Sequence, residues 1–414
     1  MIKIYSVIKI IMDKIISSLF EKDQILIHKL DKNKYFNRNI EVVNFKIIWF
    51  IGLRWVWKTT FLLQKRVLEE KGLYISMDDL SLKNIYKFEL IKEINKAYWI
   101  TKFYLDEIQF LSDWENILKN AYDFLDIEII FTGSSMIDLV KWSIDLSRRV
   151  LIYNINIFSF LEYEKFYWNN FNSFSLDDIL DNSFKFSQKY SSKISNIRFN
   201  KYLEFWQFGY FFEYNNENIF NKLLQNSIRK SIYEDLIKFI DIHTTNISKI
   251  EDLLSFIASS ASSDITINSL SKKIWLNNIT VEWYLNYLEK LWWIISINKF
   301  WNISENIRKE KKFYLTNTNL FYIFSSFLLE VSVFNWNLRE TFVISNLYRV
   351  KDKYNFKIFF KSRTDIILVF KDWRKVELEI WWKNKSRKDV LVVKDNILIW
   401  DKRTIPLWMF WFLD

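Results

Sequence analysis

The sequence predicts an α/β protein whose first domain is built on a parallel β-sheet covered by helices on both faces. The first supporting observation is that continuous apolar runs of strand length alternate with amphipathic segments of helical length, which is the pattern of βαβ units. These runs span residues 45–51, 73–79, 102–108 and 127–135. The second observation is the spacing G-x-x-x-x-W-K-T, from Gly52 to Thr59, directly after the first run. The third is an acidic pair, Asp106 and Glu107, at the end of the third run.

The segment from Gly52 to Thr59 matches the phosphate-binding loop, G-x-x-x-x-G-K-[ST], except that Trp57 replaces the last glycine. In such a loop the backbone N–H groups and the helix N-terminus cradle phosphates. We therefore expect a P-loop NTPase in which Lys58 reaches the β and γ phosphates and Thr59 binds Mg²⁺. An indole at position 57 would fill the phosphate volume. The alternative interpretation is an ordinary strand–helix turn that happens to carry a lysine.

The composition suggests an explanation for the tryptophan. The chain of 414 residues contains 4 glycines and 20 tryptophans, whereas average glycine usage of about 7% would give roughly 29 glycines. Glycine and tryptophan together number 24. We interpret most of these tryptophans as glycines whose UGA codons have been read as tryptophan, since some bacterial lineages use UGA for glycine.

Several tryptophans stand where a turn or a close backbone approach would favour glycine. These are Trp55, Trp57, Trp373, Trp381 and Trp382. We expect the disputed tryptophans to lie in turns and exposed loops and not to fill the core. Trp114 and Trp408 occupy ordinary apolar positions and are expected to be genuine. The alternative is a truly tryptophan-rich chain that uses indoles to stack on bases.

Parallel strands bring their carboxyl ends to one edge of the sheet, where ligands bind. Asp106 and Glu107 follow the third apolar run, and Thr132 lies near the end of the fourth. We expect Asp106 to hold Mg²⁺ and Glu107 to orient the attacking water. Thr132, Ser134 or Ser135 is expected to sense the γ-phosphate. Arg149, in "DLSRRV", is a candidate arginine finger acting within the chain or from a neighbouring subunit. Its alternative interpretation is a surface arginine.

The overall composition limits the class of protein. The chain has no cysteine, which excludes a disulfide framework and cysteine–zinc sites and suits the cytoplasm, where we expect the protein. The net charge of +10 mildly favours a polyanionic partner, although lysine enrichment from an AT-rich coding bias weakens that inference. No stretch reaches the roughly 18 apolar residues of a membrane span, so no membrane association is expected. Residues 1–24 predict an amphipathic helix and not a signal peptide.

Five segments carry a family resemblance: "GLRWVWKTTFLLQ", "FYLDEIQFLSDWENILKNAYD", "IIFTGSSMIDL", "DLSRRV" and "FSFLEYEKF". Together they resemble prokaryotic AAA-type ATPases that carry a C-terminal domain of unknown function. That family typically has G-x-R-x-x-G-K-T-T, L-D-E-I-Q, T-G-S-S, L-S-x-R and S-F-x-E-[FY] at these places. The resemblance implies binding of ATP and Mg²⁺. The residues implied to contact the nucleotide are Gly52, Arg54, Trp55, Val56, Trp57, Lys58, Thr59, Thr60 and Ser134.

The resemblance continues into the C-terminal half, for example at "YLEFWQFGYFFEY" and "VELEIWWKNKSRKD", so nearly the whole chain is covered. Several tryptophans of this chain meet glycines in that family, which supports the recoding interpretation. They are Trp57, Trp206, Trp336, Trp381, Trp382 and Trp411. We expect four parts: an N-terminal helical extension at 1–40, an AAA-type P-loop ATPase domain at 41–170, a helical lid and winged-helix-like region at 171–325, and a nuclease-like domain at 326–414.

The segment "ITINSLSKKIWLNNITVEWYLNYLEKL" resembles a helix-turn-helix whose second helix starts at Thr280. The segments "WIISINKF" and "KKFYLTN" are candidate wing strands. A winged helix would place Asn278, Thr280 and Glu282 near the major groove of DNA. The alternative is a lid or protein-docking domain, since Glu282 and Glu289 are unfavourable beside phosphates.

A helix with Glu340, a strand with Asp365 and a strand with Glu379 resemble the restriction-endonuclease-like fold. In that fold two carboxylates hold magnesium and a lysine steadies the nucleophile. The usual spacing is E-x-K, whereas Lys383 lies four residues after Glu379. We therefore favour a retained fold over active cleavage.

The sequence thus predicts an AAA-type ATPase whose Mg²⁺-dependent ATP hydrolysis switches a partner-binding C-terminal half. Two alternatives stay open: a DNA-binding regulatory or defence protein in which ATP is a switch, and a Mg²⁺-dependent nuclease. The expected partners are ATP, DNA through the winged helix, an unidentified protein and further copies of the chain in a homo-oligomer.

Overall fold

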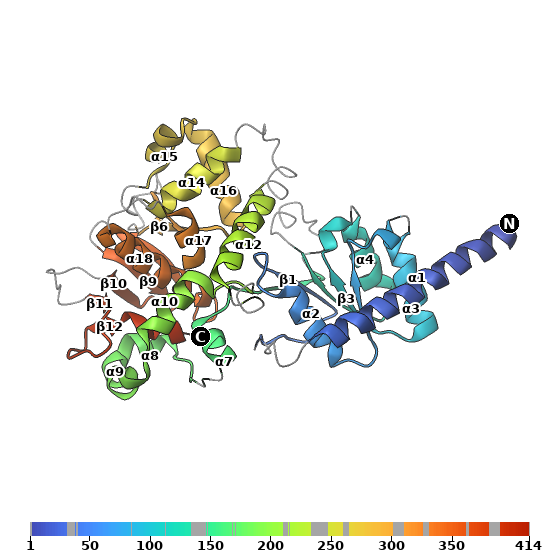
Figure 1. The fold of residues 1–414 in the computed structure, drawn as a ribbon, viewed down its shortest axis with the longest axis horizontal. Helices are drawn as coiled ribbons and strands as arrows, with labels where there is room; N and C mark the ends of the chain where they lie inside the picture. Colours follow the sequence, from blue (N-terminus) through green and yellow to red (C-terminus); the bar gives the residue numbers. More distant parts are fainter. Residues whose placement is uncertain are drawn as a thin grey trace. The chain divides into compact units, whose positions relative to one another are not determined.

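A computed structural model divides the chain into two compact units, Met1–Asn156 and Ile157–Asp414, which are described separately (Figure 1). It describes residues 2–30, 38, 40–83, 85–111, 113–133, 146, 148–167, 169, 171–209, 214, 216–232, 247–259, 265–300, 310–325, 331–361, 364–380 and 390–413. For residues 2–8, 247 and 331–335 it describes the backbone alone.

The first unit contains a five-stranded parallel sheet with the strand order β2-β3-β4-β1-β5. Its strands are β1 (Ile47–Ile51), β2 (Gly72–Ser76), β3 (Lys102–Asp106), β4 (Glu128–Thr132) and β5 (Leu151–Asn154). Its helices are α1 (Ile2–Lys29), α2 (Lys58–Val67), α3 (Lys87–Tyr98) and α4 (Trp114–Phe124), with the 3-10 turns η1 (Leu80–Leu82) and η2 (Ile108–Phe110). The predicted α/β fold with a parallel sheet is therefore confirmed.

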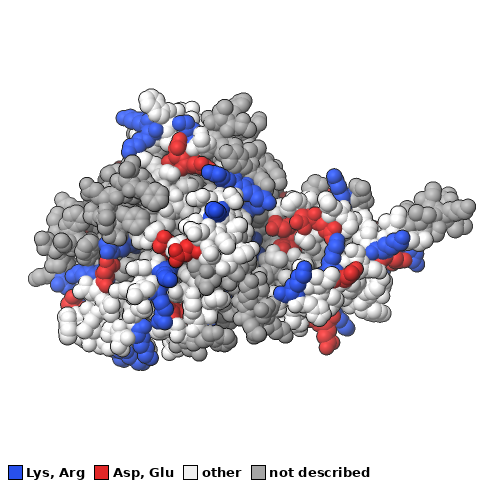
Figure 2. Space-filling model, in the orientation of Figure 1, with Lys and Arg blue, Asp and Glu red and all other residues white. Residues whose placement is uncertain are grey.

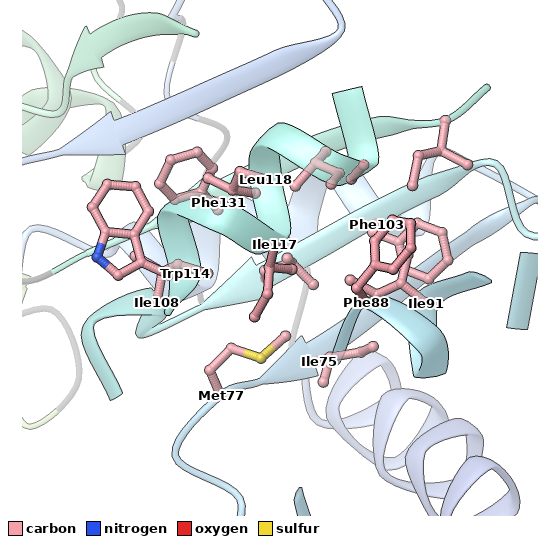
Figure 3. Close-up of a cluster of buried hydrophobic side chains, with 14 of the residues drawn as sticks. Ile75, Met77, Phe88, Ile91, Phe103, Ile108, Trp114, Ile117, Leu118 and Phe131 are labelled. Atoms are coloured by element: carbon pink, nitrogen blue, oxygen red, sulfur yellow. The ribbon is translucent and has the colours of Figure 1, made fainter. Parts of the chain in front are cut away.

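The two faces of this sheet bury different side chains, because successive residues of a strand point to opposite faces. On one face, Phe103 of β3 and Phe131 of β4 belong to a buried cluster with Ile91 of α3 and Ile117 of α4 (Figure 3). Helix α2 contacts β2, β3 and β4. Strands β1, β2 and β3 are thus buried over nearly their whole length, which explains their continuous apolar sequences.

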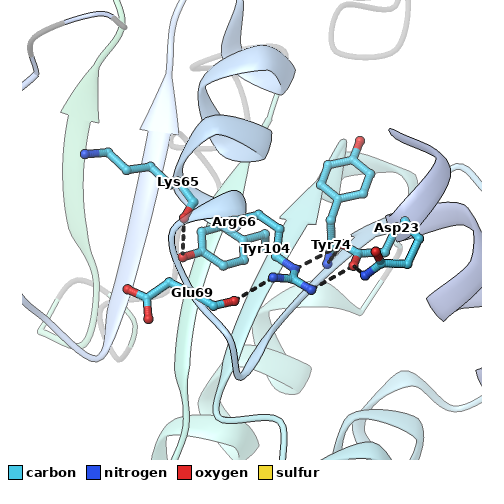
Figure 4. A network of polar contacts seen from close by, with 7 residues as sticks. Asp23, Lys65, Arg66, Glu69, Tyr74 and Tyr104 are labelled. Carbon is cyan, nitrogen blue, oxygen red and sulfur yellow. Dashed lines mark hydrogen bonds and ion pairs between the residues drawn. The ribbon is translucent and has the colours of Figure 1, made fainter. Parts of the chain in front are cut away.

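Helix α1 covers the edge strand β2. Ile16 and Leu19 of α1 join the buried cluster of the first unit. Asp23 of α1 accepts a hydrogen bond of 2.9 Å from the backbone N–H of Tyr74, a group that an edge strand would otherwise leave unpaired. Asp23 also pairs with Arg66 of α2, at 2.8 Å between Nη2 and Oδ2 (Figure 4). These contacts hold the expected N-terminal helix against both β2 and α2.

One local prediction for the first unit was wrong. The sequence pattern predicts a helix from about Lys58 to Lys71 that is ended by Gly72, whereas α2 ends at Val67 and Gly72 begins β2. A Cβ atom at Gly72 would lie 3.0 Å from Cδ of Arg66, so this glycine permits a close approach between helix and strand. The fifth strand, β5, was not predicted because it is short and only partly buried.

The second unit contains a seven-stranded mixed sheet with the order β12-β11-β10-β9-β8-β6-β7. Its strands are β6 (Ile294–Lys299), β7 (Lys311–Leu315), β8 (Phe356–Lys361), β9 (Thr364–Phe370), β10 (Lys375–Ile380), β11 (Leu391–Lys394) and β12 (Thr404–Pro406). The pairs β6/β7, β8/β9 and β9/β10 are antiparallel, and the others are parallel.

Helices of the second unit precede, interrupt and cover this sheet. They are α7 (Phe160–Phe166), α8 (Leu176–Asp181), α9 (Ser183–Tyr190), α10 (Asn196–Phe205), α12 (Glu217–Lys230), α14 (Ile247–Ser259), α15 (Ile267–Ile274), α16 (Asn278–Lys290), α17 (Thr318–Phe324) and α18 (Val331–Val350), with the 3-10 turns η3 (Ser191–Lys193) and η7 (Leu407–Phe412). Among the described residues, no helix is both long and apolar enough to cross a bilayer.

The structure bears on the expected organisation of the second unit. The candidate wing strands are present as β6 and β7, but β6 also pairs with β8. The winged-helix-like and nuclease-like regions are therefore joined through one sheet. The four-part division of the chain stays a prediction.

Candidate functional site

The loop between β1 and α2 passes very close to the end of β5. A Cβ atom at Gly52 would lie 2.3 Å from the backbone oxygen of Ile155, so only glycine fits there. Trp55 and Trp57 have φ angles of 62° and 60°, which is the left-handed region that favours glycine. Trp57 immediately precedes α2 and is 6% exposed. The loop thus adopts a backbone that glycines would suit at three places.

Tryptophan dominates the left-handed backbone positions of the described chain. The residues other than glycine with positive φ are Trp55, Trp57, Trp99, Trp275, Trp292, Trp373, Glu107 and Asn355. A bulky aromatic residue in this region is a genuine outlier. Trp114 and Trp408, which the sequence marks as genuine, do not appear in this set and are 7% and 2% exposed. The backbone therefore separates the two groups of tryptophans at these positions.

The expectation that disputed tryptophans avoid the core was wrong for three of those named above. Trp373 is 77% exposed, but Trp57, Trp206 and Trp411 are 6%, 1% and 3% exposed. The rings of Trp206 and Trp411 lie among other aromatic side chains, and neither residue has a positive φ that would mark it. Trp381 and Trp382 lie outside the described residues.

Lys58 and Thr59 open α2 at the carboxyl edge of the sheet. The Lys58 ammonium donates hydrogen bonds to the backbone oxygens of Gly52, at 3.0 Å, and Leu53, at 2.7 Å. The lysine therefore folds back over the loop and is 8% exposed. The Thr59 hydroxyl donates to Oδ2 of Asp106 at 2.6 Å, although Thr59 itself is exposed. These contacts bring together the P-loop and the acidic strand end, as predicted.

Asp106 is the most heavily bonded side chain of this site and is 3% exposed. Besides Thr59, its carboxylate accepts hydrogen bonds from the Thr132 hydroxyl, from the Glu107 N–H at 3.1 Å and from the Tyr74 hydroxyl at 2.9 Å. Thr132 was expected at this edge and is found there, whereas Ser134 lies outside the described residues.

Glu107 lies beside this cluster in a left-handed conformation, with φ 54°. Its carboxylate accepts a hydrogen bond from the Gln109 amide. Burial and the Asp106 charge raise the pKa of Glu107, while the Gln109 hydrogen bond, Lys58 and Arg54 act in the opposite direction. Arg54 is therefore also close enough to influence this carboxylate. The arrangement holds a partly buried carboxylate beside a candidate metal ligand, which suits the orientation of a water molecule.

Arg149 is placed away from the loop within its own unit. It pairs with Asp123 at the end of α4, at 3.2 Å, and lies over the Tyr122 ring. It precedes β5 in the sequence, and the Tyr122 carbonyl binds Lys46, which precedes β1. Arg149 therefore lies at the amino edge of the sheet, opposite the phosphate loop. The role of an arginine finger within the same chain is not supported, and a role in a neighbouring subunit stays a prediction.

Two residues at the site were missed by sequence reasoning. Tyr74 lies in the middle of β2, and its sequence context "LYIS" is that of any buried strand. Arg38 is 8% exposed, and its Nη1 donates to the backbone oxygens of Val56 and Asn156, both at 2.9 Å. It thereby ties the P-loop to the chain after β5. No local pattern marks either residue.

The donor set at the carboxyl edge fits a magnesium ion. Mg²⁺ prefers hard oxygen ligands and is usually held by one or two carboxylates together with substrate phosphates. Thr59 and Asp106 offer a hydroxyl and a carboxylate oxygen within one hydrogen-bond length of each other. The described part of the chain contains no group of three or more His, Cys, Asp or Glu side chains placed to bind a metal.

The residues expected for a nuclease-like site lie in the second unit. Glu340 of α18 is 1% exposed, accepts a hydrogen bond of 2.8 Å from the Tyr314 hydroxyl and lies 3.9 Å from the Lys312 ammonium. Burial raises the pKa of Asp365 of β9, whereas the Ile380 N–H and Lys312 lower it. Glu340 and Asp365 therefore share Lys312 as a neighbour. Glu379 lies on β10, next to β9, while Lys383 lies outside the described residues.

Comparison with known proteins identifies two domain families in the chain. Residues 44–164 match the AAA domain family, and residues 201–328 match a domain of unknown function, DUF8612. The AAA-domain match covers all five strands of the first unit, β1 to β5. An uncharacterized protein of the archaeon Methanocaldococcus jannaschii, MJ1637, is 27% identical over 376 residues, which are 85% of this chain and 79% of the relative.

Solved structures with some likeness to this chain include two nucleotide-bound proteins. AMPPCP-bound DnaA from Aquifex aeolicus is 14% identical, and the match covers 64% of this chain and 86% of the DnaA chain with a TM-score of 0.28. The S. cerevisiae Hsp104–ADP complex is 16% identical, and the match covers 65% of this chain and 39% of the Hsp104 chain with a TM-score of 0.26. Likeness at this level carries no argument about function.

Proposed function

We propose that the chain is an ATP-binding AAA-type ATPase that hydrolyses ATP with Mg²⁺. The observation that carries this proposal is the hydrogen bond between Thr59 and Asp106, which joins the end of the P-loop to the acidic end of β3. A hydroxyl and a carboxylate in this relation, beside a lysine folded over a glycine-suited loop, are the parts that phosphoryl transfer requires.

Each residue has a defined part in this proposal. When the nucleotide binds, the Lys58 ammonium gives up its hydrogen bonds to the backbone oxygens of Gly52 and Leu53 and donates to phosphate oxygens instead. Thr59 and Asp106 would hold Mg²⁺, which, when bound, neutralises charge on the β and γ phosphates. Glu107 orients the attacking water. Its raised pKa makes the carboxylate a stronger proton acceptor, as a general base requires.

The proposal includes glycine at positions 55 and 57 of the natural protein. A glycine would adopt the observed left-handed backbone without the strain of about 1–3 kcal/mol that other residues incur, and would leave the phosphate volume open. Mass spectrometry of the native protein tests this directly. Cleavage after Arg54 and Lys58 releases residues 55–58 as one peptide. We expect the mass of a peptide with two glycines, and two intact indoles would overturn the proposal.

Nucleotide binding is tested with a fluorescent ATP analogue and the full chain carrying Trp55→Gly and Trp57→Gly. We expect tight binding by this chain and loss of binding when Lys58→Ala is added. Lys65→Ala is the matched control, because Lys65 lies on the same helix and contacts the Phe61 ring. An affinity unchanged by Lys58→Ala, or equally reduced by Lys65→Ala, would refute the site.

We further propose that the nucleotide state changes how residues 157–414 engage a partner in the cytoplasm. Support comes from the division of the chain into an AAA-type unit and a larger second unit with its own sheet. The measurement is distance-dependent fluorescence transfer between one dye on each unit, with and without ATP. Transfer that is the same in the ATP, ADP and nucleotide-free states would contradict a switch.

DNA is the second candidate partner. Support comes from α15 and α16, which contact each other, and from the antiparallel strands β6 and β7 that follow them. Lys272 and Lys273 are exposed at the end of α15, but Glu282 is exposed on α16. On the face shown in Figure 2, basic and acidic side chains are interspersed among the described residues and form no continuous basic surface.

A gel-shift titration at several salt concentrations tests DNA binding. Phosphate contacts make affinity fall steeply with salt. We expect Lys272→Ala with Lys273→Ala to weaken binding and to flatten this dependence. Lys185→Ala with Lys189→Ala removes the same charge from exposed positions on α9 and is the control. Equal losses in both double variants would point to non-specific attraction and contradict this surface.

For the nuclease-like region we propose a retained fold without cleavage. The carboxylates of Glu340 and Asp365 face the Lys312 ammonium, a cation of the chain itself that compensates their charge. A plasmid-nicking assay with Mg²⁺ should show no activity above that of an Asp365→Asn variant. Nicking that this substitution abolishes would establish a magnesium nuclease instead.

A further inference from the structure

The Tyr74 side chain connects the edge strand of the first unit to the candidate metal ligand. We propose that Tyr74 is a positioning residue that orients the Asp106 carboxylate for Mg²⁺. This inference rests on the proposed ATPase function and adds to it a residue outside the P-loop and the acidic pair.

The sheet register explains why Tyr74 can reach Asp106. Strands β2 and β3 are parallel neighbours in which Ser76 lies opposite Asp106 and Tyr74 lies opposite Tyr104. Residues two apart in a strand share a face, so Tyr74 and Asp106 lie on the same face of the sheet. The Tyr74 hydroxyl spans the diagonal and donates to Oδ2 of Asp106 at 2.9 Å.

The four donors around Asp106 divide between its two oxygens. Oδ1 accepts from the Thr132 hydroxyl and the Glu107 N–H, and Oδ2 accepts from the Thr59 and Tyr74 hydroxyls. Two acceptor sites on each oxygen are thereby used. Thr59 is exposed and is itself a proposed metal ligand, whereas Tyr74 is 5% exposed within a strand. Tyr74 is thus the donor on Oδ2 whose position the sheet holds constant.

The backbone of Tyr74 is held by Asp23 of α1, at the edge of β2 that faces away from β3. Its N–H donates to Oδ1 of Asp23, and the same carboxylate binds Arg66 in two places, at 3.1 and 2.8 Å. Arg66 belongs to α2, the helix that begins with Lys58 and Thr59. Figure 4 shows this network of α1, α2 and β2. The contacts therefore fix Tyr74 relative to the helix that carries the other proposed metal ligand.

Tyr104 provides a matched control. It lies opposite Tyr74 in the register, is also buried, at 1% exposed against 5% for Tyr74, and directs its hydroxyl to the backbone oxygen of Lys65 at 3.4 Å (Figure 4). Tyr74→Phe and Tyr104→Phe each remove one hydroxyl from neighbouring strands on the same face. Only the first removes a donor from Asp106.

The test uses the full chain with Trp55→Gly and Trp57→Gly and measures Mn²⁺ binding by electron paramagnetic resonance, in the presence of a non-hydrolysable ATP analogue. Loss of a group that orients a metal ligand typically costs 10–100-fold in metal affinity. We expect Tyr74→Phe to weaken Mn²⁺ binding about 10-fold, to leave metal-free binding of the analogue unchanged and to lower kcat more than it changes KM. Tyr104→Phe should match the parent in all three.

The possible outcomes separate the two proposals. If the parent binds the analogue and Mn²⁺ but Tyr74→Phe binds Mn²⁺ equally well, the positioning role is wrong and the ATPase proposal stands. If both phenylalanine variants lose the same affinity, a general effect on the fold replaces the positioning role. If the parent binds neither probe, both proposals fail. Thermal melting of each variant, with Tyr74→Phe expected to melt like Tyr104→Phe, shows that the metal readout does not report unfolding.

Discussion

The Thr59 hydroxyl donates a 2.6 Å hydrogen bond to Oδ2 of Asp106, 47 residues further along the chain. Thr59 follows the loop after β1, and Asp106 ends β3, while β4 lies between these two strands in the sheet. The contact therefore crosses the end of β4, where Thr132 also donates to Asp106. The strand order is what gathers the three side chains.

Removing the Thr59 hydroxyl should affect metal-dependent binding selectively. In the chain with glycine at 55 and 57, Thr59→Val should abolish the gain in ATP-analogue affinity that Mg²⁺ provides, because the hydroxyl is a proposed ligand. Thr59→Ser keeps the hydroxyl and should retain the gain. The measurement is an analogue titration with and without Mg²⁺. A valine variant that still responds to Mg²⁺ would remove Thr59 from the metal site.

Replacing an exposed tryptophan that has a left-handed backbone with glycine should make the protein more stable. Trp99, Trp275 and Trp373 are 76%, 86% and 77% exposed and have positive φ. Each substitution to glycine should raise stability by about 1 kcal/mol, because it removes left-handed strain and little buried area. Denaturant unfolding of each variant measures the change.

Trp114 provides the opposite expectation. It is 7% exposed, and its ring lies 5.5 Å from that of Trp49. Trp114→Ala should therefore cost about 3–5 kcal/mol. If the three exposed variants lost stability as well, glycine at those positions would not be supported.

The pair of Asp23 and Arg66 should be important for the first unit. Its side chains are 0% and 9% exposed, and breaking a buried ion pair by removing one partner typically costs about 3–5 kcal/mol. We expect Asp23→Ala to destabilise the first unit by that amount. Lys22→Ala, which removes a neighbouring contact to Asp79 in which the lysine side chain is 48% exposed, should cost under about 1 kcal/mol. Comparable losses would show that α1 adds stability by packing alone.

The buried Glu164 should make stability depend on pH. Burial raises its pKa, although Arg198 at 3.1 Å and Asn169 at 2.8 Å oppose the shift. A carboxyl group whose pKa is raised in the folded state contributes stability below its unfolded pKa of about 4.3, and this contribution is lost as pH rises through the folded pKa. The melting temperature of Glu164→Gln should therefore improve relative to the parent between acidic and neutral pH. A difference that does not vary with pH would contradict this expectation.

Much of the nucleotide site could be predicted before the fold was known. The P-loop spacing around Lys58 and the acidic pair at Asp106 are local patterns, and the rule that parallel strands end at a common edge brings them together. Arg149 shows the limit of that reasoning. Its motif lies near a strand, but it precedes β5 and pairs with Asp123 at the other edge, and no local pattern tells which edge a charged side chain will face.

The sequence by itself determined where the P-loop, several glycine-suited turns and the strands β1 to β4 lie, because apolar periodicity and backbone requirements act within a few neighbouring residues. The tertiary structure decided which distant side chains meet: Tyr74 with Asp106, separated by 32 residues, and Arg38 with Val56, separated by 18. These encounters depend on the order of strands in the sheet and on the path of the chain around it. Both follow from burying many apolar faces at once, which is a property of the whole chain and not of any one segment.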